Sequence, residues 1–193
     1  MKKINEAVKK EYGNYPERIL QFGEGNFLRA FADWMVEEAN ESGEYKGSIV
    51  VCQPIDSESI VADYINEQDG LYTLVMRGLE NGEALEKAKV ITSVSRCISA
   101  YKDFDELVKI AESSQLEVVI SNTTEAGIVY KAGDKLEDAP PSSFPAKVCV
   151  LLYRRYKAFN GDQEKGLLFL PVELIDYNGD ELKRIVLKYA EEW

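Results

Sequence analysis

Short apolar runs alternate with stretches of helical spacing along this chain of 193 residues. The apolar runs predict strands, because four to six consecutive apolar or β-branched residues are typical of buried strands. They lie at residues 18–22, 48–53, 117–121 and 167–172. Apolar residues at helical spacing predict helices at residues 27–40, 57–68, 104–111, 145–159 and 180–189. The first helix is indicated by Phe27, Phe31, Trp34 and Met35, and Asn178 or Gly179 lies near the start of the last.

Two further β-rich runs, residues 71–76 and 89–98, flank Asn81-Gly82, a dipeptide typical of a hairpin turn. Strands that alternate with helices indicate right-handed βαβ crossovers. The predicted fold is therefore a single α/β domain with a doubly wound, mainly parallel sheet and an inserted antiparallel hairpin. Ligands of such sheets lie beyond the carboxyl ends of the strands, which directs attention to residues 23–26, 53–56 and 122–127. Residues 133–143 are expected to form a surface loop.

The charge balance narrows the range of partners. With 23 basic and 34 acidic side chains, the formal net charge of −11 disfavours nucleic acid and anionic membrane surfaces. No apolar run reaches the ~18 residues of a membrane span, and a cytoplasmic location is expected. The three cysteines, Cys52, Cys97 and Cys149, are widely spaced, and we expect buried thiols rather than disulfides or metal ligands.

A glycine pair follows the first predicted strand. Gly23-Glu24-Gly25 opens the first helix, which is the context in which backbone approaches a pyrophosphate in a Rossmann-type fold. The full G-x-G-x-x-G pattern is incomplete, because Leu28 stands at the third glycine position. A glycine turn needed only for tight packing is the alternative. We expect Gly23 and Gly25 to bind a dinucleotide.

The loops after two other strands carry polar candidates. Asp56 follows the second strand, where an acidic residue commonly holds the adenosine ribose; capping of the next helix is an equal alternative, and Gln53 could make the ribose contact instead. Residues 121–127, SNTTEAG, place polar side chains where a nicotinamide ring or a substrate would lie, although Thr123 or Thr124 could instead cap a helix.

Catalytic groups are scarce. The chain contains no histidine, which excludes a Ser-His-Asp triad, a Cys-His pair and a histidine-ligated zinc within it. Tyr153 and Lys157 have the Tyr-x-x-x-Lys spacing of short-chain dehydrogenases, but chance predicts about one such pair in this composition. The residues therefore indicate no catalytic group in this chain and no metal site.

Four segments together resemble the mannitol dehydrogenase family, the polyol-specific long-chain dehydrogenases. They are residues 21–34 (QFGEGNFLRAFADW), 121–128 (SNTTEAGI), 144–148 (FPAKV) and 171–179 (PVELIDYNG). Within that family the chain is most similar to the branch that reduces the hexuronate D-tagaturonate to D-altronate with NAD(H). The resemblance implies that Gly23, Gly25, Asn26 and Phe27 form the dinucleotide turn. It also implies that Asn122, Thr123 and Thr124 lie at the nicotinamide, with Glu125 and Asn178 near the substrate.

The resemblance also has consequences for catalysis. Glu173-Leu174 stand where the mannitol branch has Asp-Asn, so an oxyanion-binding asparagine is not carried over. Family members are more than twice this length, and their helical C-terminal domain supplies the lysine acid/base. Residues 1–193 are therefore expected to be the NAD-binding domain alone, with the catalytic domain outside it. Alternative substrates are fructuronate or a polyol. Alternatives of another class are a module that only binds NAD(H) and an S-adenosylmethionine-dependent transferase.

Overall fold

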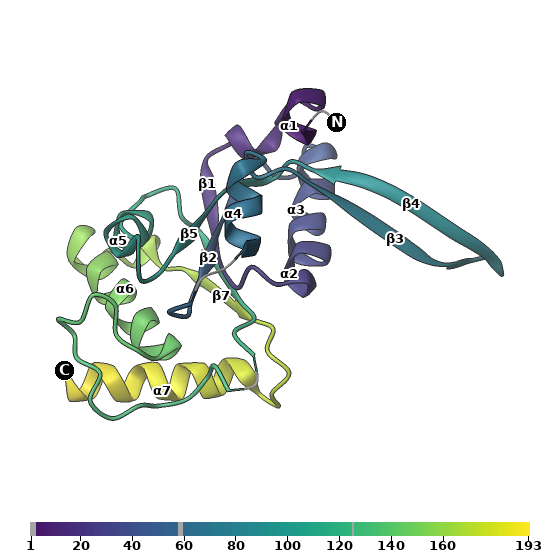
Figure 1. The fold of residues 1–193 in the computed structure, drawn as a ribbon. Coiled ribbons are helices and arrows are strands. Elements are labelled where there is room, and N and C mark those ends of the chain that lie inside the picture. The colour runs from purple at the N-terminus through teal and green to yellow at the C-terminus, as the bar shows by residue number, and fades with distance from the viewer. Residues whose placement is uncertain (1–2, 58–59, 125) are drawn as a thin grey trace.

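The computed structural model describes residues 3–57, 60–124 and 126–193 and shows a parallel sheet with helices on both faces (Figure 1). Its strands are β1 (Glu17–Phe22), β2 (Ser48–Gln53), β5 (Val94–Ser99), β6 (Val118–Ser121) and β7 (Leu168–Pro171). They are ordered β5-β2-β1-β6-β7, and every neighbouring pair is parallel. The winding direction changes between β1 and β6, so the predicted doubly wound sheet is confirmed.

Successive side chains of the central strands point to opposite faces of the sheet and build two cores. Leu20, Val50 and Ile98 belong to the core under the later helices, whereas Ile19 and Val51 belong to the core under the earlier ones. The helices are α1 (Ile4–Ala7), α2 (Asn26–Ala30), α3 (Ala32–Glu41), α4 (Ile60–Glu67), α5 (Phe104–Ala111), α6 (Phe144–Ala158) and α7 (Asn178–Glu192), with 3-10 turns at Tyr12–Asn14 and Gln163–Lys165. As expected, the three cysteines are buried in these cores.

The predicted hairpin is a separate two-stranded sheet that projects from the body of the domain (Figure 1). It consists of β3 (Tyr72–Glu80) and β4 (Glu83–Ile91). Asn81 and Gly82 both have positive φ, 54° and 84°, as a two-residue hairpin turn requires. The β-rich run 89–98 is not one strand: it divides at Thr92, where the Glu37 carboxylate accepts hydrogen bonds from the Thr92 amide and hydroxyl.

The single helix expected at residues 27–40 is also divided, at Phe31, and its spaced apolar residues do not form the buried face. Phe27, Phe31 and Met35 are 51, 40 and 47 % exposed. The buried face is made by other residues, several of them polar: Leu28, Ala32, Asp33, Val36, Glu37 and Asn40. The polar residues can lie inside because each has a partner there, as the Asn40 amide has in Gly47.

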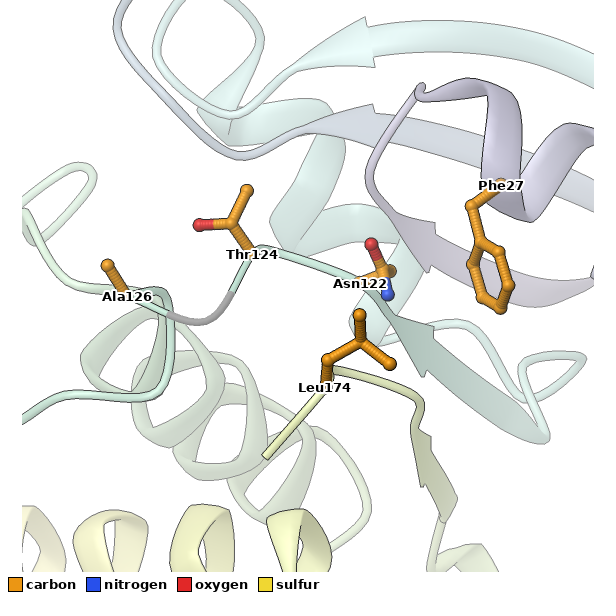
Figure 2. A pocket seen from close by; sticks show the side chains of 5 residues that line it. All are labelled: Phe27, Asn122, Thr124, Ala126 and Leu174. Atoms are coloured by element: carbon orange, nitrogen blue, oxygen red, sulfur yellow. The ribbon is translucent and has the colours of Figure 1, made fainter. Parts of the chain in front are cut away.

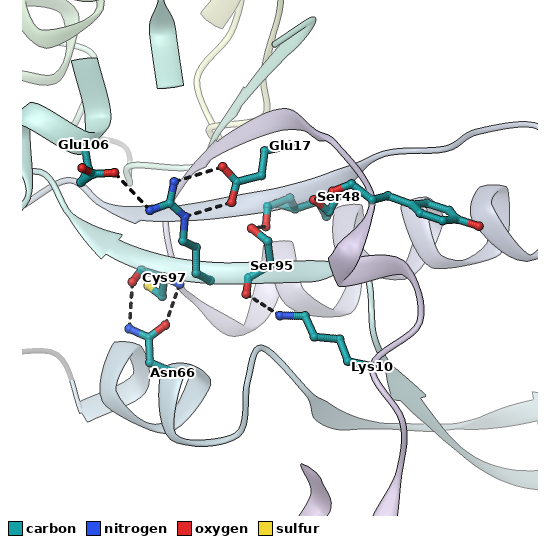
Figure 3. Close-up of polar contacts among 10 residues, drawn as sticks. Lys10, Glu17, Ser48, Asn66, Ser95, Cys97 and Glu106 are labelled. Atoms are coloured by element: carbon teal, nitrogen blue, oxygen red, sulfur yellow. Dashed lines mark hydrogen bonds and ion pairs between the residues drawn. The ribbon is translucent and has the colours of Figure 1, made fainter. Parts of the chain in front are cut away.

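Side chains protect the outer edge of the sheet at β5 (Figure 3). The Asn66 amide of α4 pairs with both the N–H and the carbonyl of Cys97, each at 2.8 Å. The Lys10 ammonium donates to the Ser95 carbonyl at 2.6 Å. Arg96 joins the strand to Glu17 at 2.9 and 3.0 Å. The backbone groups that another strand could use are thereby occupied.

Candidate functional site

Gly23 directly follows β1 and packs against Asn122, the residue after β6. Its φ is 120°, and a Cβ at this position would lie 2.8 Å from the Asn122 carbonyl oxygen. The Gly23 N–H donates to Cys52 O and the Asn122 N–H donates to Phe22 O, both at 2.9 Å. Gly23 is thus required by the packing of three strands, which is the structural alternative considered for the glycine pair.

Gly25 has different surroundings. It precedes α2 with φ −68° and ψ 166°, which any residue can adopt, and a Cβ built here would meet no protein atom within 4 Å. Packing therefore does not explain a glycine at this position. Its missing side chain leaves the outer surface of the turn open to a ligand.

Arg29, which the sequence did not single out, fastens this turn. Its Nε donates to the Glu24 carbonyl at 3.0 Å, and its guanidinium also donates to Asn26 Oδ1. The guanidinium lies 5.6 Å from the centre of the Tyr72 ring. The predicted residue Asn26 is therefore held at the first position of α2, with a cation beside it.

A cavity of about 500 Å³ lies next to the turn, at the carboxyl ends of the central strands (Figure 2). It is lined by Phe27, Asn122, Thr124, Ala126 and Leu174. The cavity brings three predicted site residues together from the loops after β1 and β6. Leu174, 83 % exposed, comes from the loop after β7 and was noted in the sequence only as a departure from the mannitol branch.

Side-chain hydrogen bonds tie the loop after β6 to the end of β7. Asn122 Nδ2 donates to Val172 O at 2.8 Å, and the Thr123 amide and hydroxyl donate to Glu173 Oε1 at 3.1 and 3.0 Å. Asn178 Nδ2 donates to the carbonyls of Pro171 and Glu173, both at 3.0 Å. Glu173 is 3 % exposed. These contacts position the loops and leave Thr124, which is exposed, as the threonine that faces the cavity.

Two other predicted residues lie elsewhere. Asp56 is exposed after β2 and does not line this cavity. Gln53 is buried, and its Nε2 donates to the carbonyl and the hydroxyl of Ser57 at 2.7 and 3.0 Å. A second cavity, of about 250 Å³, lies at the ends of β2 and β5, with Gln53 and Ser99 among its lining residues. Glu125 lies outside the described residues.

Lys147 supplies a buried cation near these strand ends. It lies on α6 and is 1 % exposed; its Nζ donates to Ser142 O at 3.0 Å and lies 4.6 Å from the centre of the Tyr101 ring. Burial lowers the pKa of Lys147 to about 8, against the attraction of Asp134. The sequence placed Lys147 in a segment that resembles the family but indicated no role for it.

The described residues bring together neither the Tyr-x-x-x-Lys pair with the cavity nor a set of metal ligands. Tyr153 and Lys157 are exposed on α6. Within residues 3–57, 60–124 and 126–193, no group of three or more cysteine, aspartate or glutamate side chains is arranged to hold a metal ion. None of the helices in those ranges has the length and apolar character that a membrane span requires.

The family comparison matches residues 17–193 to the mannitol dehydrogenase Rossmann domain. The chain belongs to the mannitol dehydrogenase family. Among its curated relatives in this family, the altronate oxidoreductase of Escherichia coli O7:K1 is 53 % identical over 180 residues, which are 93 % of this chain and 37 % of that protein. The altronate oxidoreductase of Bacillus subtilis strain 168 is 49 % identical over 193 residues, 100 % of this chain and 40 % of that protein.

Two solved structures share the fold. Mannitol 2-dehydrogenase of Pseudomonas fluorescens, in a ternary complex with NAD and D-mannitol, matches with a TM-score of 0.77 at 19 % identity over 94 % of this chain and 38 % of that one. A substrate-free D-sorbitol dehydrogenase matches with a TM-score of 0.75 at 22 % identity over 95 % of this chain and 40 % of that one. The chain thus spans well under half the length of the relatives it matches.

Proposed function

We propose that this chain is the NAD(H)-binding domain of a tagaturonate reductase, also called altronate oxidoreductase, which interconverts D-tagaturonate and D-altronate. The observation that carries NAD(H) binding is the glycine turn, where Gly25 leaves the backbone open with no internal packing reason. The identity of about half of all positions to two altronate oxidoreductases supports D-tagaturonate over fructuronate or a polyol as the substrate.

Different residues of this chain would bind different parts of the cofactor. The open turn from Gly23 to Asn26 would receive the pyrophosphate, and Arg29 beside it supplies a positive charge in a protein whose net charge is −11. Asn122 and Thr124 would lie at the nicotinamide end, where Phe27 and Leu174 form apolar walls. Asp56 would lie at the adenosine ribose. When bound, the cofactor supplies the hydride that reduces the keto carbon.

The catalytic acid is proposed to come from outside these residues. Reduction of a keto group leaves an alkoxide that must gain a proton from a group within hydrogen-bond reach. We propose that residues 1–193 form one NAD-binding Rossmann-type domain, and that a helical C-terminal domain carries the lysine acid/base and binds the hexuronate carboxylate. The match to only 37 and 40 % of the two relatives supports this division.

Binding of NADH by this chain tests the proposal. We expect NADH fluorescence and calorimetry to report binding, with S-adenosylmethionine as the competing ligand of the alternative transferase. Gly25→Val should weaken NADH binding more than about tenfold, or about 1.4 kcal/mol, because the side chain fills the open turn. The matched control is Gly78→Val on β3, where a Cβ also meets no atom within 4 Å.

The outcomes separate the alternatives. Both variants should unfold at the wild-type temperature, since neither new side chain meets the protein. Retained NADH binding by Gly25→Val would show that the turn is structural only. Tighter binding of S-adenosylmethionine than of NADH would favour the transferase. If this chain binds NADH but the full-length protein turns over neither hexuronates nor polyols, the result favours the module that only binds NAD(H).

A further inference from the structure

Asp33 is a buried carboxyl group beneath the glycine turn. The dinucleotide motif does not explain why an acidic residue is buried at this position. Asp33 lies on α3 and is 0 % exposed. Its Oδ2 is 2.9 Å from the Tyr72 hydroxyl, and that hydroxyl is also 2.7 Å from the Arg29 carbonyl oxygen. Tyr72 therefore joins Asp33 to α2, the helix that follows the turn.

The hydrogen bonds around Asp33 lack a proton if its carboxyl group is ionised. Tyr72 has one hydroxyl proton for two acceptors. On the other side, Gln21 Nε2 donates to the Gly23 carbonyl at 3.2 Å, while Gln21 Oε1 and Asp33 Oδ1 are both buried without a hydrogen-bond partner in the described part of the chain. A neutral acid supplies the missing donor, either to Tyr72 or on the side of Gln21.

Burial also favours the acid. Burial raises the pKa of Asp33 to about 7, against the hydrogen bond from Tyr72, the nearby Gln21 amide and the charge of Arg29, which lower it. The charged and titratable groups that face this site are Arg29 from α2, Tyr72 from β3 and Glu37 from α3 itself. The Arg29 guanidinium is bonded to the turn, and the Glu37 carboxylate is bonded to Thr92.

We propose that Asp33 is a positioning residue for the glycine turn, and that it carries a proton whenever a dinucleotide pyrophosphate lies on that turn. The inference rests on the proposed function and adds to it the protonation state of Asp33. Protonated Asp33 can donate to the Tyr72 hydroxyl, which then keeps its own proton on the Arg29 carbonyl of α2. Ionised Asp33 competes for that proton and weakens the bond that holds α2, the helix after the turn. An ionised Asp33 also places a buried negative charge beside the pyrophosphate.

The dissociation constant for NADH, measured by calorimetry from about pH 6 to about pH 9, tests the inference. In the wild-type chain it should rise by up to about tenfold per pH unit above the pKa of Asp33, because binding takes up a proton. Asp33→Asn, which imitates the neutral acid, should bind NADH with a constant independent of pH. Glu37→Gln, the control on the same helix, should keep the wild-type dependence.

A second measurement needs no ligand. The chain has no histidine, so few groups titrate near neutrality, and the Asp33 side-chain carbon should show its NMR titration there. Lys147 is the other buried group expected in this range, and the Asp33→Asn variant separates the two. A titration below about pH 5, or the same pH dependence of NADH binding in wild type and Asp33→Asn, would overturn the inference alone. Absence of NADH binding at every pH would overturn the proposed function as well.

Discussion

Gln53 ends β2 and Asp56 lies in the loop after it, and the structure gives the two residues opposite surroundings. Gln53 is buried and its amide nitrogen is bonded to Ser57, so it has little freedom to turn toward a ribose. Asp56 is exposed, and its charge reaches Tyr101 in the loop after β5, where it contributes to raising the pKa of that tyrosine after the larger effect of burial. Of the two ribose candidates, the structure favours Asp56.

Asp56→Ser should therefore relax the preference for NAD over NADP. The carboxylate would repel a 2′-phosphate, and its removal should improve NADPH binding relative to NADH by roughly tenfold. Dissociation constants for both cofactors at one low salt concentration provide the measurement. Asp105→Ser, which removes an exposed charge on α5, is the control and should leave the ratio unchanged. If Asp56→Ser also leaves it unchanged, Asp56 only caps the following helix.

Residues whose role depends on sequence-local geometry were predictable, and residues whose role depends on distant partners were not. Gly23, Gly25 and Phe27 follow a strand and open a helix, and they lie at the cavity or its turn as expected. Asp33 and Arg29 have partners up to 60 residues away, and no local pattern distinguishes them from solvent-exposed charges. For this reason the spaced apolar residues between positions 27 and 35 predicted a helix correctly but did not predict which of its faces is buried.

At the scale of elements, the order of strands and helices along the chain followed from periodicity, and the parallel, doubly wound arrangement followed from the rules for crossovers. The order of the strands within the sheet was not predicted. The division of the run 89–98 at Thr92 has a physical cause that periodicity does not show. Buried polar groups of α3 bond to the chain between β4 and β5. These long-range hydrogen bonds lie where β4 ends and before β5 begins, and hydrophobic periodicity cannot predict them.

One polar side chain, that of Arg155, joins helix α6 to the segments that surround it. It lies on α6, is 4 % exposed, and donates to four carbonyl groups from three other segments. They belong to Ala111 (2.6 Å), Ser113 (2.7 Å), Leu116 (3.0 Å) and Lys165 (2.6 Å). These carbonyls end α5 and lead into β6 and β7, so the arginine fixes the starts of both strands.

Arg155→Leu should lower the free energy of unfolding by about 3 kcal/mol or more, because four carbonyls lose their donor and several remain buried. Arg154→Leu, at the exposed neighbouring position, is the matched control and should change stability by less than about 0.5 kcal/mol. Urea unfolding followed by circular dichroism measures both. Equal effects of the two substitutions would mean that water replaces the guanidinium without loss.

At the scale of the whole chain, the proposed function makes the cavity one side of an active site. The cavity is bordered by exposed apolar side chains, Phe27 at 51 % and Leu174 at 83 %. A hydride transfer requires the nicotinamide and the keto carbon to be held together and shielded from water. The relatives contain well over half of their length outside the region matched here, and the proposed second domain would cover this surface.

We therefore expect this 193-residue chain to bind NADH and yet to reduce D-tagaturonate at no measurable rate. The alkoxide formed by hydride addition needs a proton donor with a suitable pKa. The chain has no histidine, Tyr153 and Lys157 are exposed on α6, and Lys147 is buried against Tyr101. A net charge of −11 also repels an anionic hexuronate unless dedicated cations bind it.

NADH oxidation by this chain, measured beside the full-length altronate oxidoreductase of Bacillus subtilis, tests this expectation. Turnover within about tenfold of that enzyme would contradict the need for a second domain, and would make Thr124, Tyr153 and Lys157 the first positions to substitute.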